Sequence, residues 1–448
     1  MSVDKLVDST QLNADLTSVA NAIRSKSGKS GSLSFPSEFV SEINGIDAVA
    51  NENAFDDVIF IDYDGDLLYH YSATEFNALT EMPANPAHAG LTAQGWNWTL
   101  ADAKQYVNSY GGLTIGQNYI TSDGVNRFYF DIPAESLNIA ISYGQTIARG
   151  VSVDWGDGNI EATDGTGTVE VSHTYSSPGS YCISLDQTSG VLSFPGFFQK
   201  KVKPIDKFRL KEINFGNCVI NNSTYVFYRE VGLEKVSIPI GLNMNHIGFG
   251  YTALKGFVYP SGATNIGGGY WVVQGCSYLD FISVPNSITN ININLSQVNL
   301  LRFEAPPLAT NVSKSPVGNR TVRYTFSDSV TTNIANYQMK VRLRALKIPS
   351  NTTSLVQNYA ADCYSIREPI YVPSGVTTVN ARAFGDVYTD IHFASTTPPT
   401  LSNTNAFTAS DMLIIYVPYS ADHSILEAYK TATNWSTFAS YMQEEPQS

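Results

Sequence analysis

A seven-residue phrase recurs ten times in the second half of the 448-residue chain. It reads Leu-x-x-Φ-x-Φ-Pro, where Φ is apolar, and it is clearest in "LEKVSIP", "LKGFVYP" and "LDFISVP". Successive phrases lie 21 to 25 residues apart, and a fixed period of this length with one short β-phrase per unit predicts a solenoid. The last position of the phrase falls at Gly216, Pro239, Pro260, Pro285, Pro306, Ser327, Pro349, Pro373, Ser395 and Pro418.

The order of residue types in the phrase is the one expected for a stack of coils. Its two alternating apolar residues point one strand face inward, where they pack on the same positions of neighbouring coils. Proline has no amide hydrogen and therefore ends the strand. A second apolar pair, as in "NSITNI" at 286–291, predicts the opposite wall of each coil. We therefore expect Leu254, Leu279 and Leu300 to lie on adjacent layers of one apolar interior.

Several units carry a longer pattern. The stretch "VPSGVTTVNARAF" at 372–384 reads Pro-x-x-Val-x-x-Val-x-x-x-Ala-Phe, and "GCSYL" and "DCYSI" add a cysteine before the next apolar residue. This pattern resembles the BspA-like leucine-rich repeat family. The resemblance implies a leucine-rich-repeat solenoid over residues 205–420 with Cys276 and Cys363 in its core. It also implies a surface adhesin or a binding scaffold.

Residues 421–448 predict a helix that covers the last coil, because a solenoid needs a terminal cap. Ser424 and Glu427 have the spacing of a capping box. The alternative is a membrane or partner helix. The stripe expected to face the coil consists of Leu426, Tyr429, Thr433, Trp435, Phe438 and Met442.

The N-terminal part of the sequence predicts two small units. Residues 1–48 have apolar residues at helical spacing on both sides of "KSGKSGS", which indicates a helical module whose apolar faces attach to another chain. Residues 55–125 predict a small β/α unit: a hairpin with an Asp-Gly turn, then a helix from the cap Thr99 to Gly111. In the hairpin, "DYDGD" could begin a calcium loop, but Ala73 stands where the loop needs its Glu, so a solvated turn is the preferred interpretation.

Residues 126–195 predict a sandwich of short strands. In "VSVDWGDG", Val151, Val153 and Trp155 share one face, and "SHTYSSPGSYCISL" shows a second alternation. WGDG followed by HTY-x-x-PG-x-Y is similar to the polycystic-kidney-disease (PKD) type of immunoglobulin-like domain. That resemblance implies a spacer or adhesive module without catalysis. The whole chain is therefore predicted to be mainly β and multidomain.

Composition excludes several classes of function. The net charge of −13 disfavours nucleic acid, which needs clustered Lys and Arg, and it equally disfavours an anionic membrane surface. No stretch has the ~18 apolar residues of a membrane-spanning helix, and the first residues do not have the form of a secretory signal. The four cysteines form no Cys-x-x-Cys pair, which favours free thiols over a zinc or redox site.

The sequence shows no pattern of residues that is typical of a catalytic site. The six histidines are dispersed and none has metal-binding spacing, so we predict no catalytic residue, no cofactor and no metal. Asp154 and Asp157 could bind a cation, although Asp before Gly is the ordinary solution of a turn. An enzyme such as a polysaccharide depolymerase would need paired carboxylates, and the repeats show no such pairing.

Aromatic side chains between the first phrases are the candidate ligand contacts. They could stack on sugar rings or on loops of a partner, or they could be inward residues of the coil wall. The candidates are Tyr225, Tyr228, Tyr251, Tyr270 and Trp271.

The start of the chain and "GLTAQGWNWTLADAKQYV" at 90–107 resemble segments of phage tail-associated proteins. We therefore expect a non-enzymatic virion protein at the tail or capsid surface, assembled in the host cytoplasm, such as a tail fibre or a baseplate receptor-binding component. Residues 1–48 would attach to other virion proteins, and the solenoid would contact a host-surface glycan or protein. A homo-oligomer, such as a trimer, is expected. The alternatives are a capsid decoration or head-fibre protein and a bacterial surface adhesin.

Overall fold

The structure is a computed structural model of the chain. It divides into two compact units, Met1–Asp57 and Val58–Ser448. The helical module predicted for residues 1–48 lies outside the described residues apart from Leu16 and Thr17, which are helical. The structure describes these two residues together with 57–194, 198–199, 206, 208–220, 226–242, 248–266, 272–292, 295, 297–300, 302–313, 323–325, 345–361, 363, 366, 368–410 and 412–446.

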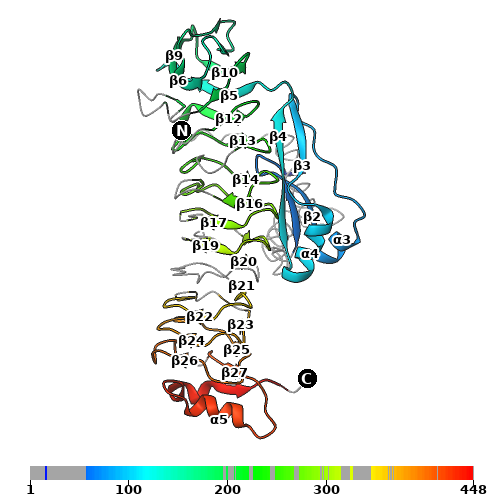
Figure 1. Cartoon of the computed structure of the whole chain (residues 1–448), viewed down its shortest axis with the longest axis vertical. Coiled ribbons are helices and arrows are strands. Elements are labelled where there is room, and N and C mark those ends of the chain that lie inside the picture. Colours follow the sequence, from blue (N-terminus) through cyan, green and yellow to red (C-terminus); the bar gives the residue numbers. More distant parts are fainter. Residues whose placement is uncertain are drawn as a thin grey trace, which may run out of the picture. The chain divides into compact units, whose positions relative to one another are not determined.

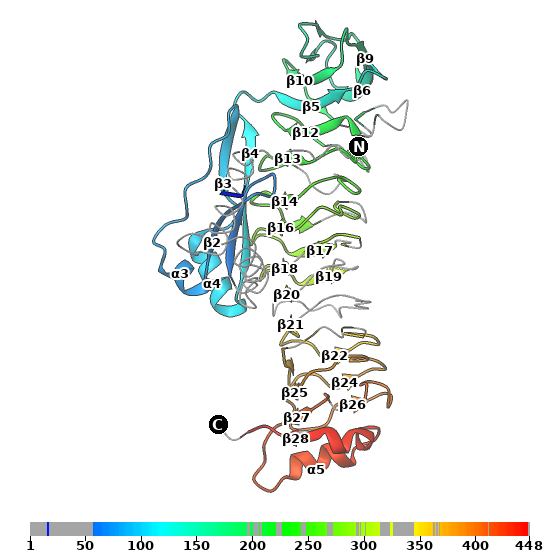
Figure 2. The same cartoon turned by 180° about the vertical axis from the view of Figure 1, so that it is seen from behind.

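The second unit contains the predicted solenoid (Figures 1 and 2). Each of the ten phrases forms a short strand, and paired neighbours run parallel, as in Gly256↔Phe281 and Ile370↔Ile391. The prediction of ten stacked coils is therefore confirmed. The ten strands are β12 (Leu210–Asn214), β13 (Lys235–Ser237), β14 (Gly256–Val258), β16 (Phe281–Ser283), β18 (Arg302–Glu304), β20 (Arg323–Thr325), β21 (Ala345–Leu346), β23 (Ile370–Val372), β25 (Ile391–Phe393) and β27 (Ile415–Val417).

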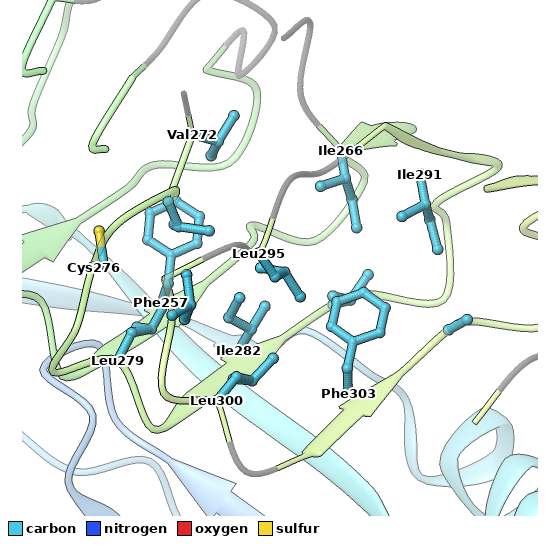
Figure 3. Close-up of a cluster of buried hydrophobic side chains, with 14 of the residues drawn as sticks. Phe257, Ile266, Val272, Cys276, Leu279, Ile282, Ile291, Leu295, Leu300 and Phe303 are labelled. Atoms are coloured by element: carbon cyan, nitrogen blue, oxygen red, sulfur yellow. The ribbon is translucent and has the colours of Figure 1, made fainter. Parts of the chain in front are cut away.

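A second row of strands forms the opposite wall of the coils, as the second apolar pair predicted. The two rows enclose one apolar interior, part of which Figure 3 shows. Leu254, Leu279 and Leu300 are fully buried in it, and so are Cys276 and Cys363. Because the coils bury their inward apolar residues against one another, the stack is stabilised as a whole. The second row consists of β15 (Asn265–Ile266), β17 (Asn290–Asn292), β19 (Asn311–Ser313), β22 (Ser354–Leu355), β24 (Thr378–Val379) and β26 (Thr400–Leu401).

The strands before the coils form two sheets, one of which also includes the first two coil strands. One has the order β13-β12-β5-β10-β7-β8 and the other the order β11-β6-β9. Val151, Val153 and Trp155 are buried between them as predicted, and β5 pairs antiparallel with β12, so one sheet continues from this region into the first coil. The PKD-type assignment remains a prediction. The strands are β5 (Asn126–Ile132), β6 (Asn138–Gln145), β7 (Val151–Asp154), β8 (Ile160–Glu161), β9 (Gly167–Thr174), β10 (Gly179–Gln187) and β11 (Leu192–Ser193).

The predicted β/α unit is a four-stranded sheet of order β2-β1-β4-β3 with two helices. Its hairpin is confirmed, since β1 and β2 pair antiparallel around Gly65. Its second helix is confirmed as well, because Thr99 caps the start and Gly111 ends it. The elements are β1 (Val58–Ile61), β2 (Leu67–Tyr71), α3 (Ala73–Ala78), β3 (Leu91–Trp96), α4 (Leu100–Tyr110) and β4 (Leu113–Thr121).

The C-terminal residues cover the last coil, but the single helix and its capping box were wrong. The helix α5 (Ser424–Thr431) begins after His423, and the Ser424 hydroxyl donates to Asp422 instead of capping a backbone amide. Asn434 then adopts a left-handed conformation and a 3₁₀ helix, η3 (Trp435–Tyr441), follows. The chain ends in β28 (Met442–Glu444), which pairs with β27 as a further rung. Of the predicted stripe, Tyr429, Trp435, Phe438 and Met442 are nevertheless buried, whereas Leu426 is half-buried and Thr433 is exposed.

Candidate functional site

The β/α unit covers the strand face of the first coils. We define the outward column as the residue between the two inward apolar residues of each phrase. In the first five coils this residue is buried, and β4 packs along β12, β13, β14, β16 and β18 (Figures 1 and 2). The face that a solenoid would otherwise present is therefore closed in this half. The five residues are Asn214, Ser237, Val258, Ser283 and Glu304.

Glycines permit this close packing. A Cβ on Gly116 of β4 would lie 2.5 Å from Val258 Cγ1 and 2.7 Å from Ser283 Cβ. A Cβ on Gly256 would lie 2.3 Å from the Cα of Gly65 in the β1–β2 turn. Since real Cβ atoms do not approach so closely, only glycine fits at these positions.

The side chains of the β/α unit also donate to backbone carbonyls of successive coils. Gln94 Nε2 donates to Ile238 O (3.3 Å), and Asn97 Nδ2 donates to Tyr259 O (3.2 Å). Trp98 Nε1 donates to Val284 O (2.8 Å). Each of these acceptors is the residue before the proline of its phrase.

The prolines explain why these carbonyls need outside donors. In the last coils, Val372 O accepts from the amide of Ala394, the residue after the strand of the next coil. The register of β14 and β16 places Pro285 at this donor position for Tyr259, and the repeated phrase gives Pro260 and Pro306 the same place for Ile238 and Val284. Proline has no amide hydrogen, and a buried carbonyl without a partner is destabilising. The β/α unit therefore supplies the hydrogen bonds that the prolines remove.

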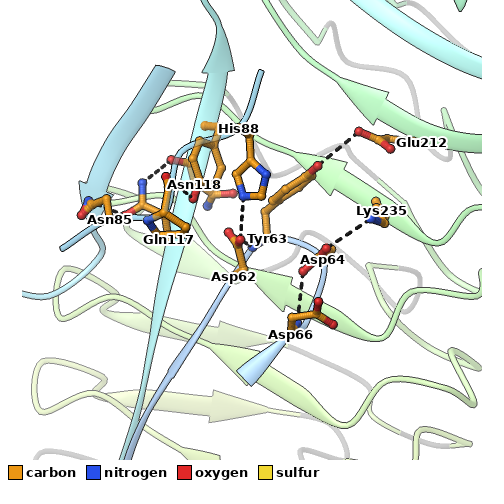
Figure 4. Close-up of polar contacts among 12 residues, drawn as sticks. Asp62, Tyr63, Asp64, Asp66, Asn85, His88, Gln117, Asn118, Glu212 and Lys235 are labelled. Carbon is orange, nitrogen blue, oxygen red and sulfur yellow. Dashed lines mark hydrogen bonds and ion pairs between the residues drawn. The ribbon is translucent and has the colours of Figure 1, made fainter. Parts of the chain in front are cut away.

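A polar junction fixes the hairpin of the β/α unit to the first two coils (Figure 4). Tyr63 donates from its hydroxyl to Glu212 (3.2 Å), and Lys235 lies 3.2 Å from Asp64. Burial raises the pKa of Tyr63 above its ordinary value, and the nearby Glu212 carboxylate raises it further. Two carboxylates of "DYDGD" thus have protein partners: Asp62 lies 2.7 Å from His88, and Asp64 accepts the amide of Asp66.

In the last coils the residues of the same column are exposed or half-buried. Its residues there are Tyr371, His392 and Tyr416, which the register aligns on β23, β25 and β27. The His392 ring stacks on both neighbours, with centroids 4.7 Å from Tyr371 and 4.4 Å from Tyr416. Tyr371 is 64% exposed. We call these three residues the aromatic ladder.

The ladder is held in place from the C-terminus. His392 Nδ1 lies 2.6 Å from Glu445 Oε1, and the Glu445 amide donates to Val417 O (2.8 Å). At the other end of the column, Lys347 extends over the ring of Tyr110, at the end of α4 (4.3 Å). The ladder is therefore a preorganised aromatic surface that begins one coil beyond the last column residue in contact with the β/α unit.

The predicted aromatic contacts lie elsewhere, at a corner of the coils. Tyr228 and Tyr251 are half-buried, and their rings meet edge to face with centroids 5.6 Å apart. The guanidinium of Arg229 lies over both rings, 5.2 and 5.6 Å from the centroids. We call Tyr228, Arg229 and Tyr251 the corner cluster. The other predicted contacts, Tyr225, Tyr270 and Trp271, lie outside the described residues.

The sequence prediction therefore found two members of the corner cluster and missed the aromatic ladder. The neighbouring rings Phe227 and Phe249 point inward and stack in the core. A signal for the ladder was present, because three of the last four phrases carry an aromatic residue between their apolar positions.

Four of the described histidines lie beside carboxylates. His173 lies 2.7 Å from Asp157, and His423 lies 2.6 Å from Glu444, as His88 and His392 lie near carboxylates. Asp154 and Asp157 accept backbone amides of their own turn. Among the described residues, no group of three or more His, Cys, Asp or Glu could hold a metal ion, and no helix is long and apolar enough to cross a membrane.

Comparison with known families identifies the repeats. Three overlapping segments, 206–298, 274–389 and 320–414, match the BspA type leucine-rich repeat region, in six copies. The coils are BspA-type leucine-rich repeats. The sequence matches no curated protein.

Solved structures of repeat proteins are similar over about half of the chain. The pneumococcal vaccine antigen PcpA is 11% identical, covering 56% of this chain and 82% of its own, with a TM-score of 0.27. A leucine-rich repeat protein from Bacteroides ovatus is 12% identical, with coverages of 57% and 96% and a TM-score of 0.28. A leucine-rich cell surface protein from Faecalibacterium prausnitzii is 14% identical, with coverages of 50% and 83% and a TM-score of 0.19.

Proposed function

We propose that this chain is a non-catalytic attachment protein whose leucine-rich repeats present a rigid surface to a glycan or protein on a cell. The observation that carries the proposal is the aromatic ladder. Aromatic rings on a preorganised sheet give large contact area with little loss of side-chain freedom on binding. Because Tyr371 is exposed, its ring edge and its hydroxyl are available to a ligand.

The more specific form of the proposal is a phage virion protein at the tail or capsid surface. It is supported by the resemblance of residues 1–48 and 90–107 to phage tail-associated proteins. In this form, residues 1–48 attach the chain to other virion proteins, and the chain is a homo-oligomer, such as a trimer. The PKD-type region would act as a spacer, and a head-fibre or capsid decoration protein would differ only in the partner of residues 1–48.

A bacterial surface adhesin is the second candidate. The match to BspA-type repeats favours it, since the repeats are the part of the chain that would contact the ligand. Immunogold labelling with an antibody against the repeats separates the two candidates: particles labelled at the tail or head support the virion protein, and labelled cell envelopes support the adhesin.

The test of the attachment function compares the full chain with a Tyr371→Ala/Tyr416→Ala variant. The full chain is needed because a fragment that begins near residue 200 would separate β12 from β5. We expect the wild-type protein to bind intact bacterial cells and the variant to bind at least about tenfold more weakly. Tenfold is the typical effect of removing one contact residue of moderate weight, so it is the smallest effect expected when two are removed.

The matched control is Tyr278→Ala. Tyr278 is equally exposed, at 66%, but lies outside the ladder. The control should bind as the wild type does. Equal binding by the ladder variant, with both proteins folded, would remove the ladder from the proposal.

A further inference from the structure

The corner cluster occupies a backbone position at which its residue types are unfavourable. At six of the described corners the coil turns through a residue with φ between 53° and 74°. Left-handed backbone favours glycine and asparagine and disfavours residues with large side chains. Arginine and tyrosine at this position therefore need a reason other than the fold. The corner residues are Arg229, Tyr251, Gly275, Gln297, Asn358 and Arg382.

The cluster is built so that its rings and its cation are fixed. A Cβ on Gly275 would lie 2.5 Å from Tyr251 Cδ1, so the absence of a side chain there makes room for the Tyr251 ring. The amides of Arg229 and Tyr251 donate to Gly250 O and Gln274 O of the following coils (2.9 and 2.8 Å). The two rings then hold the Arg229 guanidinium by cation–π contact. A guanidinium held in this way loses less freedom when it binds a ligand.

Arg229 differs from Arg382, the other arginine at an equivalent corner, in whether a carboxylate lies beside it. Arg382 lies 3.4 Å from Asp386, which compensates its charge. Among the described residues, no carboxylate forms an ion pair with Arg229, although the chain carries a net charge of −13. The corner cluster therefore presents an uncompensated, oriented cation beside two half-buried aromatic rings.

We propose that the corner cluster binds a carboxylate-bearing sugar, such as a uronic acid residue of a surface glycan. The planar guanidinium of Arg229 matches a carboxylate with two parallel hydrogen bonds. The rings of Tyr228 and Tyr251 offer an apolar surface for the C–H face of a pyranose and hydroxyls for its polar edge. This combination distinguishes an acidic sugar from a neutral sugar, which lacks the anion, and from a simple anion, which lacks the ring.

The proposal goes beyond the attachment function, since it assigns a second site, at a corner of the coils, and a ligand class for that site. The experiment is saturation-transfer NMR on the full chain with methyl β-D-glucuronide and methyl β-D-glucoside as probes. We expect the glucuronide to bind at least about tenfold more tightly than the glucoside, which one bidentate ion pair can supply. The preference should fall as salt rises, because the cation is exposed to solvent.

The deciding variant is Arg229→Gly, because glycine accepts the left-handed corner without strain. It should keep or raise the melting temperature and lose the preference for the glucuronide. Arg229→Lys should retain part of the preference for the glucuronide, because lysine keeps the positive charge but lacks the planar guanidinium that forms two parallel hydrogen bonds. Arg382→Gln is the matched control at the same corner of another coil and should bind as the wild type does.

Three results would overturn the proposal. They are absence of glucuronide binding by the wild type, an unchanged preference in folded Arg229→Gly, and equally tight binding of inorganic phosphate or of a glutamate-rich peptide. The Tyr371→Ala/Tyr416→Ala variant should keep its glucuronide binding. Cell binding by the ladder variant and glucuronide binding by the Arg229 variants thus report on the two sites separately.

Discussion

The first five coils and the last three share one phrase but use its outward residue in opposite ways. In the first coils the outward residues are buried, and three of the five are Ser237, Val258 and Ser283, which leave room for β4. In the last coils they are Tyr371, His392 and Tyr416, which stack on each other, with Tyr371 largely exposed. The same repeat can therefore pack against another part of the chain in one half and carry stacked aromatic residues in the other, without any change of its core.

The carbonyl before the end of the phrase is also satisfied differently in the first coils and at Val372. Where the phrase ends in consecutive prolines, donors come from Gln94, Asn97 and Trp98 of the β/α unit. In the ninth phrase the register places Ala394, and not Ser395 as the sequence predicted, at the proline position, and there the next coil donates its own amide. The β/α unit is therefore an integral part of the first coils, and removing it would leave buried carbonyls without partners.

The largest effect should come from a methyl group between the β/α unit and the coils. Gly256→Ala would place a Cβ against the backbone of Gly65, and we expect a loss of about 3 kcal/mol of unfolding free energy from overpacking. Gly375→Ala is the matched change in the open half, where the nearest atoms lie 3.6 Å or more away. It should change stability by less than about 1 kcal/mol. Urea unfolding measures both, and equal effects would contradict a closed first half.

A smaller effect should follow from the loss of one outside donor. Trp98→Phe removes the hydrogen bond to Val284 O and should destabilise the protein by about 1–3 kcal/mol. Pro306→Ala restores an amide at the position from which the next coil could donate, so the double variant should lose less than the sum of the two single changes. Strict additivity in this double-mutant cycle would show that the proline and Trp98 are unrelated.

The smallest effect should be a pH dependence at the polar junction. Because the pKa of Tyr63 is raised in the folded protein, its stabilisation is full below the ordinary tyrosine value near pH ~10 and is lost as the pH rises above it. Amide hydrogen exchange of β1 and β2 should therefore accelerate above pH ~10 beyond the general base-catalysed rate. The Tyr63→Phe variant should lack this additional acceleration. An identical pH profile in the two proteins would exclude Tyr63 as the cause.

Local patterns predicted the parts of the fold that depend on local physics. The phrase located all ten strands, and Thr99 and Gly111 located the ends of α4. The docking of the β/α unit was not predicted, because it depends on contacts between residues more than 100 positions apart. The capping box failed because Ser424 lies inside the helix, where its hydroxyl has a nearer acceptor in Asp422.

The candidate sites show the same division. Tyr228 and Tyr251 were identified because aromatic residues between phrases are conspicuous, but the role of Arg229 requires the corner conformation. The aromatic ladder requires the register that brings Tyr371, His392 and Tyr416 into one column. The change from small to aromatic residues in that column is visible in the sequence once the phrases are aligned.

Cysteine accessibility tests the contrast between the two halves most directly. Ser283→Cys and Tyr371→Cys place a thiol in the same outward column, one beneath β4 and one in the open ladder. The rate of maleimide labelling is measured on each native variant against the parent protein with its four free cysteines. We predict that position 371 reacts at least about 100-fold faster than position 283, since the latter must wait for local opening. Comparable rates at the two positions would contradict the account.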